Sequence, residues 1–178
     1  MEAFNRLIQA FNDAHVRAVL IGVAGANYYA PTRSAAVHTD DRDLYLPPDP
    51  SNLVAAWKVC EELRLELACS GETLDIPRDL WLAERMVAVR ALTRVSDGAF
   101  LHVDLTLVMA GFEFETVWRE RRPLVDDDVE IPVARLMHIV TSKALAARPK
   151  DHLFIATHSA ALSEMVARDE RLPPRGSG

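Results

Sequence analysis

One segment of the sequence limits the possible folds more than any other: residues 39–50, TDDRDLYLPPDP. Residues 41–46 have the alternation of a β-strand. The prolines among residues 47–50 end that strand, because proline has no backbone N–H to donate to a ladder. Residues two apart in a strand point to the same side of the sheet, so Asp41 and Asp43 share one face. The fold must therefore accommodate two neighbouring carboxylates on one face of a sheet.

A later strand is predicted to carry a third acid. Residues 99–108, AFLHVDLTLV, alternate, with Phe100, His102, Asp104, Thr106 and Val108 on one side and Leu101, Val103, Leu105 and Leu107 on the other. A lone carboxylate in an interior strand is costly unless it has a partner. If the two strands are neighbours, Asp104 completes a three-carboxylate group with Asp41 and Asp43. His102 is expected either to line that group or to make a local hydrogen bond.

Neighbouring carboxylates repel, and they raise each other's pKa unless a cation lies between them. A divalent ion such as Mg²⁺ relieves the repulsion, prefers oxygen ligands and keeps positions for substrate phosphates. Three carboxylates can hold two such ions, one at the attacking oxygen and one at the triphosphate. A second interpretation is that D-x-D arises by chance on a surface strand, where alternating acids are common. The pattern by itself leaves both interpretations open.

The rest of the chain predicts an α+β (α/β) domain, residues 1–168, with a small mixed β-sheet flanked by helices and a helical C-terminal end. Helices are expected at 2–15, 23–30, 51–63, 78–85, 113–121, 134–147 and 150–167, the third capped by Ser51 or Asn52. Strands are expected at 17–21, 41–46, 65–69 and 129–133, and 86–95 with 99–108 as a hairpin. Residues 126–128 are expected to form a solvated turn, and residues 169–178 a disordered tail.

Composition narrows the possible partners. The chain has 178 residues, 49% hydrophobic and 26% charged, and no apolar run approaches the roughly 20 residues of a membrane span. Its start is predicted to be an amphipathic helix rather than a signal peptide, so we expect no membrane partner and a cytoplasmic location. The formal net charge of −6 argues against a protein that coats DNA or RNA. The net charge does not exclude a local basic pocket, for which Lys143, Arg148 and Lys150 are candidates.

Taken in order, these motifs resemble the nucleotidyltransferases of the polymerase-beta superfamily. The matching features are the strand and turn AVLIG (18–22), the helix VAGANYYA, the strand with Asp41 and Asp43, and LHVDLTL with Asp104. The resemblance is closest to small bacterial, toxin-type nucleotidyltransferases of abortive-infection systems. Those also have a threonine two residues before the first aspartate, here Thr39, and a late-helix lysine followed by R-x-K-D, here Lys143 and residues 148–151. The resemblance covers roughly residues 16–158.

The resemblance implies a nucleotidyltransferase fold and a metal-dependent enzyme. The enzyme would move a nucleoside monophosphate from an NTP to a hydroxyl on RNA, protein or a small molecule, as in toxin–antitoxin or defence systems. By the same resemblance, Asp41, Asp43 and Asp104 would be catalytic and would bind Mg²⁺ or Mn²⁺. The nucleotide would be bound by Gly22, Thr39, Lys143, Arg148 and Lys150.

The chain departs from the family pattern in two places. Val23 stands where a small residue, Gly or Ser, usually contacts the phosphates, and the stretch from Gly22 to Asp41 is a few residues longer than usual, with the excess in loop 31–39. These departures support an alternative hypothesis, a catalytically degenerate nucleotidyltransferase fold that binds a nucleotide or a partner protein. Arg33 and His38 have an R-x4-H spacing found in some RNA-cutting domains, but they are predicted to lie in a loop rather than on a helix.

Overall fold

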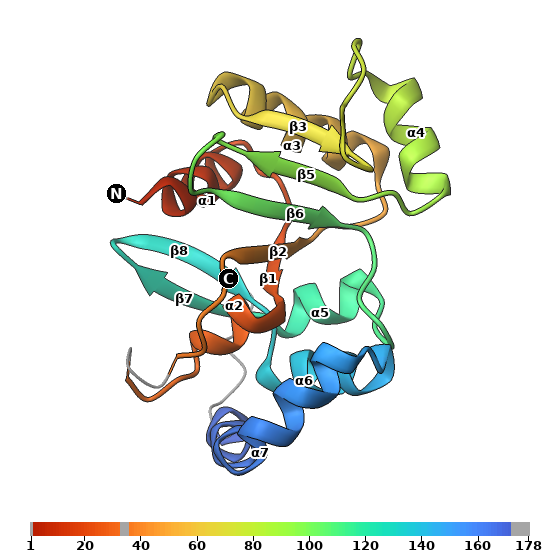
Figure 1. Ribbon diagram of the computed structural model, residues 1–178. Coiled ribbons are helices and arrows are strands. Elements are labelled where there is room, and N and C mark those ends of the chain that lie inside the picture. The colour runs from red at the N-terminus through yellow and green to blue at the C-terminus, as the bar shows by residue number, and fades with distance from the viewer. Residues whose placement is uncertain (1, 33–35, 172–178) are drawn as a thin grey trace.

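The computed structural model describes residues 2–32 and 36–171, without the side chain of Lys150, and shows a mixed α/β domain (Figure 1). The helices are α1 (Ala3–Asp13), α2 (Gly22–Asn27), α3 (Pro50–Glu62), α4 (Leu80–Ala88), α5 (Phe114–Glu120), α6 (Leu136–Ala146) and α7 (Pro149–Glu170). The strands are β1 (Val19–Ile21), β2 (Asp41–Tyr45), β3 (Glu66–Cys69), β4 (Glu72–Thr73), β5 (Thr93–Ser96), β6 (His102–Thr106), β7 (Arg122–Asp126) and β8 (Val129–Val133). No helix within these two ranges is long and apolar enough to cross a membrane.

The strands form one sheet, in the order β4-β3-β5-β6-β2-β1-β8-β7. β2 pairs antiparallel with β1 and parallel with β6, and β6 pairs antiparallel with β5. The two strands that carry the predicted acids are therefore neighbours in the middle of the sheet. The predicted α+β class with a mixed sheet is confirmed. The sheet is larger than the small one expected, because β4 and β7 extend its two edges.

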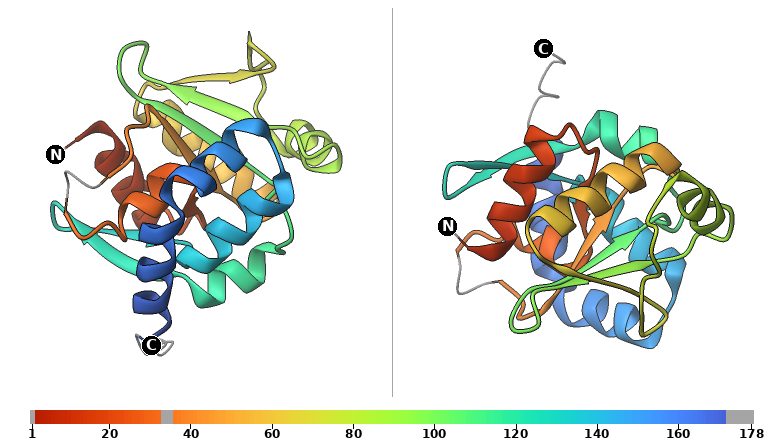
Figure 2. Two further views of the ribbon diagram at one scale, coloured as in Figure 1. Left: turned by 60° about the horizontal axis from the view of Figure 1, so that its bottom comes forward. Right: turned by 90° about the horizontal axis from the view of Figure 1, so that it is seen from above.

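The two faces of the sheet are covered by different helices. Figure 2 shows α1 and α3 on one side, with α6 and α7 on the other. On the first side, Leu44, Val103 and Leu105 are almost fully buried in one core with α1 and α3. On the second side, Ile21 and Tyr45 belong to a smaller core with α5, α6 and α7. This smaller core covers only part of its face, and the acids of β2 and β6 lie on that same face.

The first core follows directly from the sequence pattern. The apolar residues of α1 recur at helical spacing, and Phe4, Leu7, Ile8 and Phe11 are all almost fully buried, as predicted. The alternation along β6 and its flanks is confirmed too, because Leu101, Val103, Leu105 and Leu107 are buried. Burial of each such side chain contributes about 1.5–3 kcal/mol, so one face of the sheet is firmly supported.

Two predicted helix boundaries are wrong. The third helix is capped by Asp49, whose side chain accepts a hydrogen bond from the Ser51 backbone N–H at 2.9 Å, rather than by Ser51 or Asn52. Pro50 takes the first helical position, which suits proline because that N–H has no helical partner. Residues 86–88, predicted to begin a hairpin strand, instead complete α4, which Asp79 caps. The hairpin strand β5 begins only at Thr93.

Strand β7 was not predicted, and it contains Pro123. The structure accommodates it at the edge of the sheet, where a missing N–H costs no central ladder bond. Asp126 ends β7, so the predicted turn is limited to Asp127 and Asp128, both with positive φ. At the other end of the chain, α7 runs to Glu170, so the tail expected at 169–178 is wrong for Asp169 and Glu170, which are helical. Residues 172–178 lie outside the described residues.

A buried ion cluster fixes the end of α7. The side chain of Asp169 is 1% exposed and accepts a hydrogen bond from Arg122 Nε at 2.8 Å and from Arg135 Nε at 3.2 Å. Arg122 Nη2 also donates to the Asp169 backbone carbonyl at 2.9 Å. These contacts join α7 to β7 and to the residue before α6.

We expect Asp169→Asn to lower the free energy of unfolding by about 3 kcal/mol, because it leaves the charge of Arg122 buried without its partner. Urea unfolding of the purified variant measures the change. Glu170→Gln removes the same charge from the exposed next residue and should change stability by less than about 0.5 kcal/mol. Equal losses in both variants would contradict the assigned role of Asp169.

Candidate functional site

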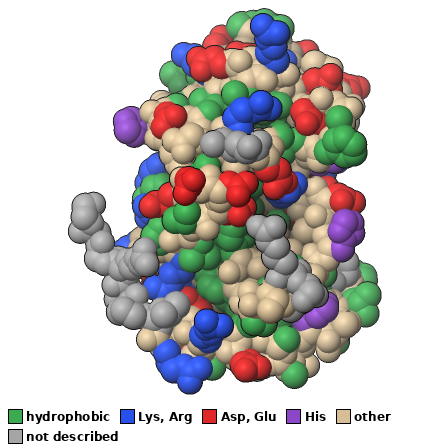
Figure 3. Space-filling view, turned by 90° about the vertical axis from the view of Figure 1, so that its left-hand side faces the viewer, with side chains coloured by type: hydrophobic (Ala, Val, Ile, Leu, Met, Phe, Trp, Pro, Cys, Tyr) green, Lys and Arg blue, Asp and Glu red, His purple; other side chains and the backbone are tan. Residues whose placement is uncertain are grey.

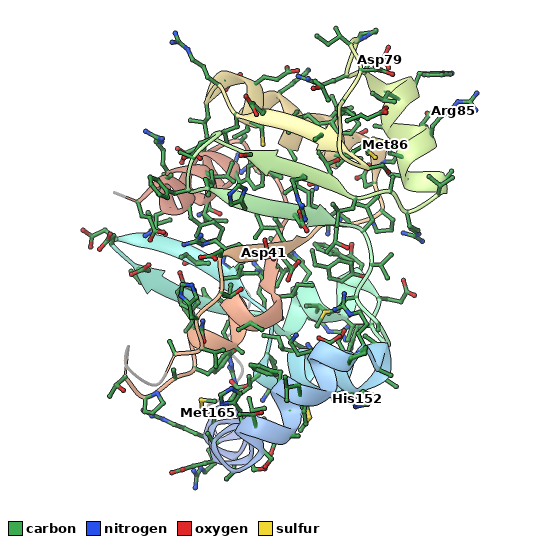
Figure 4. All side chains as sticks on the ribbon, in the orientation of Figure 1. Asp41, Asp79, Arg85, Met86, His152 and Met165 are labelled. Carbon is green, nitrogen blue, oxygen red and sulfur yellow. The ribbon has the colours of Figure 1, made fainter. Side chains whose placement is uncertain are left out.

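The parallel pairing of β2 with β6 brings the three predicted acids to one place. Asp43 is in register with Asp104, and Asp41 is in register with His102. Asp41, Asp43 and Asp104 all line a cleft of about 890 Å³. Asp41 is exposed at the start of β2, in the middle of the molecule (Figure 4), and the other two are half-buried. His102 lies on the same strand face as Asp104 but is not among the lining residues.

Gly22 packs against Asp43 where β1 passes into α2. Its backbone has φ +69°, a conformation that favours glycine, and a Cβ atom at this position would overlap the Asp43 carboxylate. Ile21, the residue before it, is in register with Asp43. Gly22 was predicted to allow a triphosphate to approach the backbone. In the structure, the carboxylate of Asp43 occupies the place that a Cβ atom at Gly22 would take.

Arg94 completes the polar group, and sequence reasoning missed it. Arg94 is in register with Asp104 across β5 and β6. Its Nε donates to Asp104 Oδ1 at 2.8 Å and its Nη2 to Asp104 Oδ2 at 2.9 Å, and these hydrogen bonds raise the pKa of the guanidinium. The available signal was the alternation of TRVS opposite LHVDL in the predicted hairpin. That signal identifies Arg94 only once the register of the turn is known.

A second charged group lines the same cleft from α6 and α7. Lys143 Nζ lies 2.8 Å from Asp151 Oδ1, and Arg148 Nε lies 2.6 Å from Asp151 Oδ2. Lys143 Nζ also lies 5.1 Å from the centre of the Phe154 ring. The structure thus places Lys143 and Arg148 in the cleft, as the resemblance implied, but both are paired with a carboxylate. The side chain of Lys150 lies outside the described part of the chain.

The side chain of Asp151 is fully buried, and its two cations keep it ionised. Burial by itself would raise the pKa of Asp151. The hydrogen bonds and charges of Lys143 and Arg148 outweigh that effect and hold the pKa below its ordinary value. Asp151 therefore fixes the positions of both cations at the cleft, and it also offsets part of their charge.

The remaining predicted residues complete the walls of the cleft. Thr39 lines it and donates from Oγ1 to the Asp41 carbonyl at 3.2 Å. Val23 lines it as well, together with exposed apolar side chains of Leu92, Val108 and Leu153. Arg33, of the R-x4-H spacing, lies outside the described residues. In Figure 3, acidic side chains cross the middle of one face, with Lys and Arg side chains above and below them.

The donor chemistry of the acids fits a divalent cation only in part. Asp41 and Asp43 present carboxylates from one strand face to the cleft, and Mg²⁺ prefers such oxygen ligands. Both oxygens of Asp104 are bonded to Arg94. Within residues 2–32 and 36–171, no three acidic, histidine or cysteine side chains are grouped as metal ligands in the present side-chain positions. A metal ion at Asp104 would therefore have to share the carboxylate with Arg94 or displace it.

Comparison of the sequence with protein-family models and with curated proteins gives no match.

The contact between Gly22 and Asp43 can be tested with a matched pair of glycine variants. Gly22→Ala and Gly98→Ala both place alanine at positive φ, which costs about 1–2 kcal/mol, but nothing lies within 4 Å of a Cβ at Gly98. We expect a crystal structure of Gly22→Ala to show the Asp43 carboxylate displaced and that of Gly98→Ala to show it unmoved. A carboxylate unmoved in both variants would contradict the close packing.

Asp151→Asn should destabilise the protein in a pH-dependent way. Because the folded-state pKa is lowered, the stabilisation by Asp151 is present above the unfolded-state pKa of about 4 and is lost as the pH falls through the folded-state value. We expect the variant to lose about 2 kcal/mol at pH 7 and the difference from wild type to shrink below about pH 4. Denaturant titrations at pH 7 and pH 3 measure this, with exposed Glu164→Gln as the control. A difference that is the same at both pH values would contradict the assigned ion pairs.

Proposed function

We propose that the protein is a metal-dependent nucleotidyltransferase that transfers a nucleoside monophosphate from an NTP to a hydroxyl acceptor. The observation that carries the proposal is the meeting of Asp41, Asp43 and Asp104 in one cleft, from two neighbouring strands. Three carboxylates on one sheet face repel one another, and this repulsion destabilises the fold. A site that binds cations would explain why the chain brings them together.

A nucleotidyltransferase fold is part of this proposal. It is supported by the order of the elements: β1, a glycine turn and α2, then β2 with the D-x-D acids, and later β6 with the third acid. It is supported also by their pairing, since β2 lies between β1 and β6 in the sheet. The resemblance described above implies this order.

In the proposed reaction, the acceptor hydroxyl attacks the α-phosphorus of the NTP, its oxygen forms the new P–O bond, and pyrophosphate leaves. Mg²⁺ or Mn²⁺, held by Asp41 and Asp43, would supply positive charge to the triphosphate. Asp104 would be the third metal ligand and would help to activate the acceptor hydroxyl by accepting its proton. Arg148, whose side chain is 60% exposed, presents its guanidinium at the cleft to a phosphate.

The charges of the cleft make metal a requirement for nucleotide binding. The cations Arg94, Lys143 and Arg148 all contact carboxylates. A bare triphosphate would therefore meet the acids of β2 without a compensating excess of positive charge. An NTP that carries its own divalent ion avoids this repulsion, so NTP and metal are expected to bind together.

A second candidate function is binding of a nucleotide or a partner protein without catalysis. Two observations favour it: Arg94 occupies both oxygens of Asp104, and the branched Val23 lines the cleft beside Gly22. Tight NTP binding without pyrophosphate release, across a broad panel of acceptors, would support this function over transfer. The acceptor, membership of a toxin–antitoxin or defence system, and the cytoplasmic location stay predictions.

We expect Asp41→Asn to abolish metal-dependent NTP binding, because Asp41 presents its carboxylate to the cleft. Calorimetric titration with each of the four NTPs, with and without Mg²⁺, measures this, followed by pyrophosphate release with candidate acceptors. Asp40→Asn is the matched control. Asp40 is the residue before Asp41, and its side chain is 80% exposed and does not line the cleft. The control therefore removes the same charge outside the site.

The outcomes separate the hypotheses. Binding that Asp40→Asn retains and Asp41→Asn loses supports a metal–nucleotide site at these carboxylates. Equal binding by both variants would show that the nucleotide binds elsewhere. A well-folded wild type that binds no NTP with either Mg²⁺ or Mn²⁺ would overturn the proposal.

A further inference from the structure

Arg94 differs from the other cations of the cleft in the carboxylate that it contacts. Lys143 and Arg148 bind Asp151, whereas Arg94 binds an acid of the group that would hold the metal. The antiparallel register of β5 and β6 places Arg94 directly opposite Asp104, so the contact is built into the sheet. Its two hydrogen bonds form the parallel fork that makes arginine–carboxylate pairs specific as well as strong.

The two partners of this pair differ in their freedom to move. The Asp104 side chain is 15% exposed and the Arg94 side chain is 55% exposed. Arg94 has a long side chain that can turn toward the open cleft, while Asp104 is short and lies on an interior strand. If the pair separates, Arg94 is the partner that moves.

A metal ion and Arg94 compete for Asp104. Each carboxylate oxygen has a second lone pair, so sharing is geometrically conceivable. A divalent cation at that lone pair would nevertheless lie within a few ångströms of the guanidinium, and two positive charges so close repel each other strongly. Metal binding at Asp104 therefore weakens the contact with Arg94, and the contact weakens metal binding.

On the basis of the function proposed above, we propose that Arg94 is an internal counter-ion that competes with the metal for Asp104 and, once displaced, binds the triphosphate. In the ligand-free protein Arg94 neutralises part of the acidic group. When metal and NTP enter together, the metal replaces Arg94 at Asp104, and the phosphates offer the guanidinium a new partner. Each ligand then favours the binding of the other, because each takes one member of the broken pair.

The first test measures Mn²⁺ affinity by calorimetry in the absence of nucleotide. Arg94→Gln removes the competitor and should bind Mn²⁺ about fivefold more tightly than wild type, the upper end of the change expected for a partly exposed ion pair. Arg42→Gln is the matched control. Arg42 lies between Asp41 and Asp43 on β2, so the substitution removes the same charge nearby. The Arg42 side chain, however, is on the other sheet face, where its Nη2 donates to Glu2 Oε1 at 2.6 Å. The control should stay within about twofold of wild type.

The second test measures the coupling between the two ligands. A non-hydrolysable α,β-methylene NTP should tighten Mn²⁺ binding severalfold more in wild type than in Arg94→Gln. The displacement itself is observable in wild type, because the Arg94 Nε–H signal in a ¹H–¹⁵N spectrum should shift when Mg²⁺ and the analogue are added together. This measurement does not depend on the folding of any variant.

Three results would overturn the inference. Equal Mn²⁺ affinity in Arg94→Gln and Arg42→Gln would show that no specific competition exists. An Arg94 Nε–H signal unchanged at saturating Mg²⁺ and analogue would show that the arginine stays on Asp104. In either case, loss of NTP binding in Asp41→Asn would still support the nucleotidyltransferase site. If wild type and Arg94→Gln both bind neither Mn²⁺ nor NTP, the inference and the proposed function fail together.

Discussion

The in-register pairing of β2 with β6 is the constraint on which the candidate site depends. It places Asp43 beside Asp104 on one face of the sheet, with Asp41 two residues away. Like charges on neighbouring strands destabilise a sheet, so the surrounding structure must compensate. Arg94 does so from the next strand, and the opposite face is stabilised by a large core with α1 and α3. The register of the sheet thus fixes the positions of the acids. A loop would hold them less firmly.

The asymmetry of the two sheet faces explains how one small domain supports both a core and an open cleft. Leu44 and Leu105 point away from the acids into the larger core, because neighbours in a strand alternate between faces. On the acidic face, Tyr45 packs edge-on against Phe114 in the smaller core, and burial raises the pKa of its phenol to about 12. The same strand therefore presents carboxylates to the cleft at its start and an aromatic ring to a core at its end. The smaller core, formed with α5, α6 and α7, includes Tyr45 but not the acids at the start of the strand.

Local patterns predicted the parts of the structure that depend on near neighbours in sequence. The alternation of β2 and β6 placed their acids on one face, and the helical spacing in α1 identified its buried side. The contacts of Arg94 and Asp151 were not predictable in the same way. The contact of Arg94 depends on the register across a turn, and the ion pair of Asp151 with Lys143 depends on how α6 packs against α7. Ala147 ends α6 in a left-handed conformation that its own sequence does not suggest. Strand β7 was missed too, and its place at the edge, which tolerates Pro123, is a property of the whole sheet.

The pairing of charges within the cleft bears on how any anionic ligand enters it. Asp104 holds Arg94, and Asp151 holds Lys143 and Arg148, so each cation already has a carboxylate partner. The two carboxylates differ in kind, however. Asp151 is fully buried and holds two cations, whereas Asp104 is 15% exposed and holds Arg94. In the proposed function, an incoming phosphate would meet Lys143 and Arg148 at Asp151, and Arg94 would first have to leave Asp104. A divalent cation would bring about that release in the proposed function, because it would bind the carboxylate that the arginine gives up.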